Sequence, residues 1–86
     1  MICLEFNEIT EQLLMQMKAL SEQPKNSSLR PAHFVIRLNT HPKPYLARYV
    51  RPLPGYICVM ALDGPAGEDR FPIETVSRIE VWWSEK

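Results

Sequence analysis

The first third of the chain carries apolar residues at the spacing of one amphipathic helix. Ile9, Leu13, Leu14, Met17 and Leu20 recur at intervals of three to five positions, with Glu, Gln and Lys filling the other positions. Asn7 fits the N-cap position, and acids follow it in the first turn, where the helix dipole favours negative charge. We expect a helix over about residues 7–22, followed by a polar, proline-containing loop over about 23–31.

After Ala32 the pattern changes to short runs separated by turn residues, which is typical of a small all-β unit. The expected strands cover residues 33–39, 45–51, 56–62, 70–73 and 78–83, with a helical turn at 74–76. The first strand alternates apolar and polar positions, whereas the second leaves its buried face ambiguous. Residues 56–62 are apolar throughout, which predicts a central strand covered on both faces, with the helix on one of them.

These elements predict an α+β fold. We expect an N-terminal amphipathic helix followed by a five-stranded, strongly bent antiparallel sheet that forms a small Sm-like or SH3-like barrel. The alternative is one helix on a flat, open antiparallel sheet. With 86 residues, the chain is expected to be a single domain over residues 1–86, with the barrel at about 32–83.

Charge is distributed in three blocks, although the formal net charge is zero. Residues 1–24 sum to −3, residues 25–62 to +6 without a single acid, and residues 63–86 to −3. The zero therefore excludes a uniformly basic protein but leaves a local site for an anionic partner.

The remaining composition indicates a cytoplasmic binding protein rather than an enzyme. Glu5 interrupts the first apolar run, so we expect neither a signal peptide nor a membrane partner. Cys3 and Cys58 are expected to be reduced core thiols, with one disulfide as the alternative. The sequence contains no recognisable nucleophile motif, metal-ligand spacing or phosphate-binding loop, so we expect no catalytic residues, metal or cofactor.

Two segments of the chain resemble a known family. They are residues 56–63 and the run Arg70-Phe71-Pro72-Ile73-Glu74-Thr75-Val76 with its continuation to residue 81. Together they resemble the WYL domain and, more broadly, the Sm-like small β-barrel superfamily, over roughly residues 48–81. The Trp-Tyr-Leu that names the family is replaced here by residues 57–59. The resemblance implies a small barrel and a regulatory module that binds nucleic acid or a nucleotide-like ligand.

The strongest candidate interface is the predicted hairpin of residues 33–51. Its cations and rings are Arg37, His41, Lys43, Tyr45, Arg48, Tyr49 and Arg51. Cations contact phosphates and rings stack on unpaired bases, so we expect a non-enzymatic regulatory module acting on a nucleic-acid process. It would contact RNA, DNA or a nucleic-acid-handling protein. In the alternative, the acidic blocks pair with these arginines at the surface.

Trp82 and Trp83 are adjacent in the last expected strand and therefore point to opposite faces. If Trp83 joins Ile79 and Val81 inside, Trp82 becomes an exposed anchor for a protein interface, with packing under the helix as the alternative. A second interpretation is thus a protein-binding adaptor or inhibitor, including a homodimer. A third is a small-ligand sensor with a pocket between the helix and the barrel.

Overall fold

The computed structural model describes residues 2–64 and 67–84. Its elements are β1 (Ile2–Phe6), α1 (Glu11–Ser21), β2 (His33–Leu38), β3 (Tyr45–Leu53), β4 (Tyr56–Ala61), β5 (Glu68–Pro72), the 3₁₀ turn η1 (Ile73–Thr75) and β6 (Val76–Trp83). The described chain is therefore α+β, with one helix and one six-stranded sheet. All neighbouring strands are antiparallel, in the order β1-β6-β2-β3-β4-β5.

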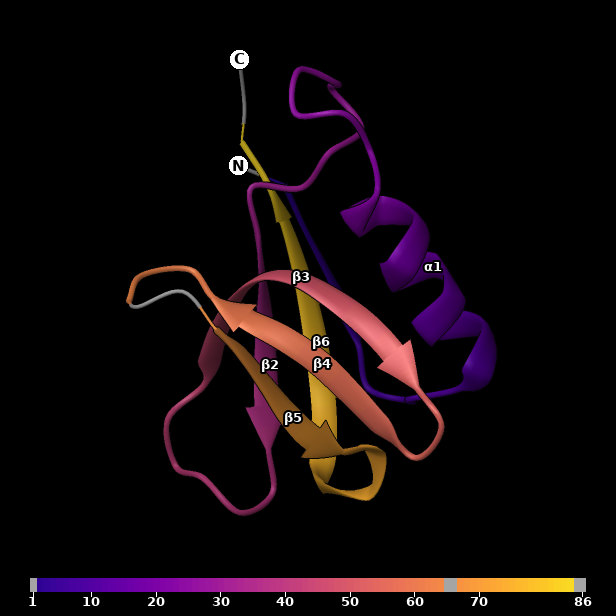
Figure 1. Ribbon diagram of the computed structural model, residues 1–86, viewed down its shortest axis with the longest axis vertical. Helices are drawn as coiled ribbons and strands as arrows, with labels where there is room; N and C mark the ends of the chain where they lie inside the picture. Colours follow the sequence, from indigo (N-terminus) through magenta and orange to yellow (C-terminus); the bar gives the residue numbers. More distant parts are fainter. Residues whose placement is uncertain (1, 65–66, 85–86) are drawn as a thin grey trace.

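The sheet is strongly bent into two crossing layers (Figure 1). β1, β6 and β2 form one layer, and β3 carries the chain from β2 across to β4 and β5 in the other. The bend confirms the expected curvature. The sheet is nevertheless not closed into a barrel, because β1 and β5 each have a sheet neighbour on one side only among the described residues.

The bend coincides with a register shift in β3. Ala47 pairs with Ala61 and Val50 pairs with Val59, so β3 has one more residue than β4 over this interval. The extra residue reverses the alternation of side chains and bends the strand. Both Ala47 and Val50 are consequently fully buried despite their odd spacing, which explains why the sequence left the buried face of this strand ambiguous.

The core lies between the two layers and under α1. Its buried members are Leu13, Leu14, Met17, Phe34, Ile36, Leu38, Ala47, Val50, Ile57, Val59, Val76, Ile79 and Val81. The three helical residues among them occupy the positions that the helical periodicity predicted. The expectation that the helix covers the apolar strand at 56–62 is wrong, because α1 packs mainly against β3.

Two expectations about the N-terminal region need correction. The helix begins at Glu11 rather than near residue 7, because the side chain of Thr10, rather than that of Asn7, caps it by accepting from the Leu13 N–H at 3.1 Å. The five expected strands are six, because residues 2–6 form β1. Within the described residues this strand has no local hairpin partner and pairs with β6 alone, Ile2 lying opposite Trp83, so no nearby turn signal identifies it.

Ser21, the last residue of α1, joins the helix to the bent strand. Its hydroxyl accepts from the backbone N–H of Val50 at 3.0 Å, and lies 2.8 Å from the carbonyl oxygen of Met17 and 3.3 Å from that of Val50. Val50 is fully buried and lies directly after the register shift. The hydroxyl therefore satisfies a backbone group that the shift leaves without a regular partner in the ladder.

We expect Ser21→Ala to lower the free energy of unfolding by about 1 to 3 kcal/mol, because it leaves the buried N–H of Val50 unsatisfied. Urea denaturation followed by circular dichroism measures this change. Ser28→Ala, in the exposed loop, is the matched control and is expected to change stability by less than about 0.5 kcal/mol. Equal stabilities for the two variants would contradict this role for Ser21.

Candidate functional site

The cations and rings of the predicted hairpin occupy several different surroundings. Arg37 lies on β2, His41 and Lys43 lie in the following connection, and Tyr45, Arg48, Tyr49 and Arg51 lie on β3. Because the register shift reverses the alternation within β3, side chains before and after it do not continue one face. The structure therefore separates these residues into distinct groups.

The acidic start of β5 contacts one of these groups. Tyr49 Oη donates to Glu68 Oε2 at 2.8 Å, and Arg51 Nη2 lies 3.0 and 2.9 Å from the two Glu68 oxygens. Tyr45 Oη donates to Asp69 Oδ2 at 2.6 Å. Part of the C-terminal acidic block thus folds back onto the basic block, so these groups are already engaged within the molecule.

These contacts perturb the two tyrosines. Burial is the largest cause that raises the pKa of Tyr45 above its ordinary 10.0, and the hydrogen bond to the Asp69 carboxylate raises it further. Burial and the hydrogen bond to Glu68 likewise raise the pKa of Tyr49, although the positive charge of Arg51 opposes the shift. Both hydroxyls are therefore held as neutral hydrogen-bond donors to carboxylates.

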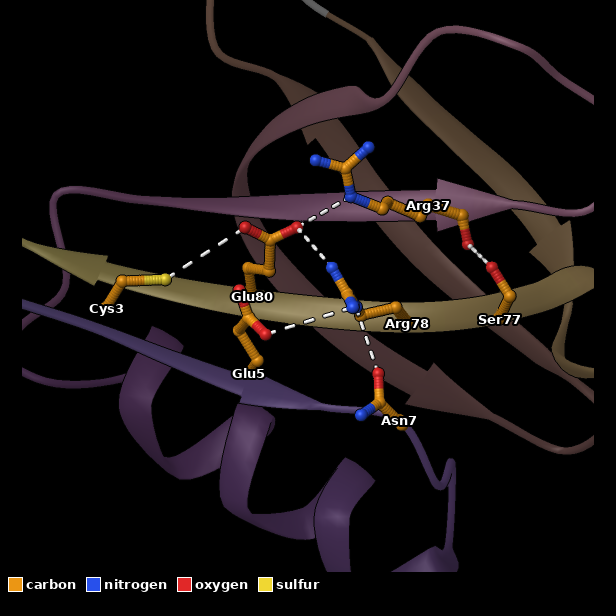
Figure 2. Close-up of polar contacts among 7 residues, drawn as sticks. All are labelled: Cys3, Glu5, Asn7, Arg37, Ser77, Arg78 and Glu80. Carbon is orange, nitrogen blue, oxygen red and sulfur yellow. Dashed lines mark hydrogen bonds and ion pairs between the residues drawn. The ribbon is translucent and has the colours of Figure 1, made fainter.

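A second group surrounds Glu80 on the outer face of the β1, β6 and β2 layer (Figure 2). The Glu80 side chain is only 5% exposed, and Arg37 Nε donates to its Oε2 at 2.7 Å. Arg78 Nη1 lies 3.9 Å from the same carboxylate oxygen, and Arg78 Nη2 lies 3.8 Å from Glu5 Oε2. Arg78 Nε donates to Asn7 Oδ1 at 2.9 Å. The cluster links all three strands of this layer and engages Arg37.

Cys3 brings a possible metal-ligating group to the same cluster. Ligand atoms of Cys3, Glu5 and Glu80 lie within 4.8 Å of one another, and the thiol is 4.0 Å from Glu80. Burial and the charges of both glutamates raise the pKa of the Cys3 thiol, which disfavours the thiolate that a metal requires. Because Arg78 contacts both carboxylates, the cluster is better described as an ion-pair network than as a metal site.

Arg48 belongs to a third group, in a groove of about 830 Å³. The groove is lined by loop residues between Lys25 and Ala32, by Arg48, Leu62 and Asp63, and by Ile2 and Ser84. Three of the lining side chains, Lys25, Arg30 and Arg48, are cationic, whereas Asp63 is the single acid among the described lining residues. The groove therefore brings together cations from two separate parts of the basic block of residues 25–62, the loop with Lys25 and Arg30 and the strand with Arg48.

Hydrogen bonds position the two arginines of the groove. Arg48 Nε donates to the Leu62 carbonyl oxygen at 3.2 Å, which uses one of the guanidinium donors. Arg30 Nη1 donates to the carbonyl oxygens of Ser21 and Gln23, and thereby ties the loop to the end of α1. Each guanidinium has five N–H donors, so both retain donors for an anion.

The loop cations were missing from the residues that sequence analysis singled out. The prediction was limited to the expected hairpin of residues 33–51, whereas Lys25 and Arg30 lie in the loop that precedes it. One signal could have identified them, since both belong to the acid-free block of residues 25–62. The sequence shows that positive charge is concentrated in this block. Only the folded chain shows which of its cations lie close together.

The other predicted residues lie outside the groove. The rings of His41 and Phe71 lie edge to face with their centroids 6.4 Å apart, and Lys43 is exposed in the same connection. Trp82 is partly buried and its ring stacks on that of His33, with the ring centroids 5.9 Å apart. Its indole N–H is buried and has no hydrogen-bond partner among the described residues. Trp83 packs against the core and donates its indole N–H to the Leu29 carbonyl at 3.1 Å.

Both cysteines are free. Cys58 is buried as expected, whereas Cys3 is only partly buried because it lies on the edge strand β1. The helix of the described region, α1, has 11 residues, and no helix there is long and apolar enough to cross a membrane.

The chain was compared with models of protein families, with curated proteins and with solved structures. None of the three comparisons finds a match.

We expect Asp69→Asn to lower the pKa of Tyr45 towards 10.0, because it removes the carboxylate charge while burial remains. An alkaline NMR titration of the tyrosine ring carbons measures the change, with Asp63→Asn as the control that leaves Tyr45 unchanged. Because the pKa of Tyr45 is higher in the folded chain than in the unfolded chain, protonated Tyr45 contributes to the free energy of unfolding. This contribution is complete below about pH 10 and is lost as the pH rises through the folded pKa. Titration of wild-type Tyr45 at or below its ordinary pKa would contradict the contact.

Proposed function

We propose that this protein is a non-enzymatic regulatory module that binds the sugar-phosphate backbone of single-stranded nucleic acid in the basic groove. The observation that carries the proposal is the convergence of Lys25, Arg30 and Arg48 on one groove. Phosphate contacts supply most of the sequence-independent affinity in such complexes.

The lining of the groove supports a phosphate ligand in particular. Asn26, Ser27 and Ser28 add neutral polar groups beside the cations, as is common where a protein contacts phosphate oxygens. The hydrogen bond from Arg48 to Leu62 and those from Arg30 to the helix end orient each guanidinium before a ligand arrives. A preoriented guanidinium loses less side-chain freedom on binding.

The groove also changes the role proposed for the hairpin. Glu68 and Asp69 already engage Tyr45, Tyr49 and Arg51, so displacing them would cost the ligand part of its binding energy. Arg48 alone among the β3 cations lines the groove. We therefore assign the contact to the groove, and we retain the nucleic-acid process that the WYL-like and Sm-like resemblance implies.

We expect wild-type protein to bind short, fluorescently labelled single-stranded RNA or DNA of mixed sequence. With three phosphate contacts, affinity should fall roughly tenfold to twentyfold between about 50 and 200 mM salt. The double variant Lys25→Gln/Arg48→Gln should weaken binding and reduce the salt slope by about 0.7 for each contact removed. Fluorescence anisotropy over a salt series measures both quantities.

Lys43→Gln is the matched control, because it removes one exposed positive charge outside the groove. It should leave the salt slope unchanged. The proposal fails if neither nucleic acid binds at low salt, or if Lys43→Gln and the groove variant weaken binding equally. Thermal unfolding of each variant separates a loss of binding from a loss of fold.

A further inference from the structure

β1 is an edge strand with an exposed apolar side. It pairs with β6 on one side, and no backbone hydrogen bond joins residues 2–6 to any other described segment. Ile2 is 58% exposed and Leu4 is 49% exposed, although both alternate onto the same side of the sheet as core residues of β6. Backbone groups and apolar side chains are thus available together along one strand edge, a surface that natural proteins usually protect.

The neighbouring helix leaves room beside this edge. A hollow of about 430 Å³ is lined by Glu5 and Phe6 at the end of β1 and by Gln12, Leu13 and Gln16 of α1. α1 makes its main contacts with β3 rather than with β1. The hollow leaves space between the C-terminal end of β1 and the start of α1.

From this edge we infer that two copies of the chain associate by antiparallel pairing of β1 with β1 about a twofold axis at Leu4, which extends each six-stranded sheet into the other. Pairing of identical edges about a twofold axis forms a closed dimer. The surface lies on the edge strand, and Ile2 is the one residue of β1 that also lines the nucleic-acid groove proposed above.

The sequence of β1 selects this register. With Leu4 opposite Leu4 of the second copy, Ile2 lies opposite Phe6 and Cys3 lies opposite Glu5. Apolar residues then meet apolar residues on one face, and the two glutamates are not opposite each other. Centring the pair on Glu5 would place like charges directly opposite, which is destabilising. Centring it on Leu4 pairs all five residues of β1, whereas centring it on Cys3 pairs three of them within the strand. The segment is therefore self-complementary in one register.

Mass and cross-linking test the dimer and its register. Light scattering over a concentration series should give a mass approaching twice the 10.0 kDa of one chain for wild-type protein. Leu4→Glu should return the mass to that of one chain, because it places like charges opposite each other at the axis. Leu46→Glu, at another exposed leucine, is the matched control and should remain dimeric.

The register is tested by disulfide formation. Directly opposite residues have Cα atoms about 4.5 to 5.5 Å apart, within the span of a disulfide, whereas diagonal neighbours lie at about 7 to 8 Å. Cys3→Ser/Leu4→Cys should therefore form a disulfide-linked dimer on oxidation, and wild-type Cys3 should not. This variant also tests the interface should Leu4→Glu fail to fold by circular dichroism.

Three results would overturn the inference. The first is a wild-type protein that stays monomeric at every concentration, which would leave β1 to another partner. The second is a dimer that persists in folded Leu4→Glu protein, which would place the interface elsewhere. The third is oxidative cross-linking through wild-type Cys3 in place of the Leu4→Cys position, which would show a different register.

Discussion

The register shift in β3 is the feature on which the arrangement of the molecule depends. A flat six-stranded antiparallel sheet could not bury Ala47 and Val50 on one side, since their odd spacing puts them on opposite faces of a regular strand. The additional residue resolves this conflict and turns the strand, which carries β4 and β5 over the first layer. It also brings Val50 to the end of α1, where the Ser21 hydroxyl supplies a hydrogen bond.

The same bend determines how the charges meet. It places the acidic start of β5 beside Tyr45, Tyr49 and Arg51, and so converts part of an acid-free segment into a locally neutral surface. Arg48 lies within the shifted interval and lines the groove with the loop cations instead. The chain therefore has a net charge of zero and still has a positive groove. Acids of β5 pair with Arg51 and the two tyrosines, whereas the groove lining has three cations and one acid.

Local patterns in the sequence predicted the local parts of the fold. Helical periodicity identified Leu13, Leu14 and Met17 as core residues, and turn residues delimited the strands from His33 onward within a few positions. Features that depend on distant partners were not predictable. These are the pairing of β1 with β6, the extra residue in β3 and the approach of Lys25 to Arg48, each of which is set by tertiary packing.

The pairing of β1 with β6 has a consequence for how the chain folds. Ile2 and Trp83 are partners although they lie near opposite ends of the described chain, so the layer of β1, β6 and β2 contains contacts of very long sequence separation. Closing a long loop costs entropy before the contact is gained, and such contacts slow folding. During synthesis β1 emerges first but has no strand to pair with until β6 has emerged. The β2 to β5 meander, whose neighbours are consecutive in sequence, can form earlier, and the Glu80 cluster must assemble in the last stage.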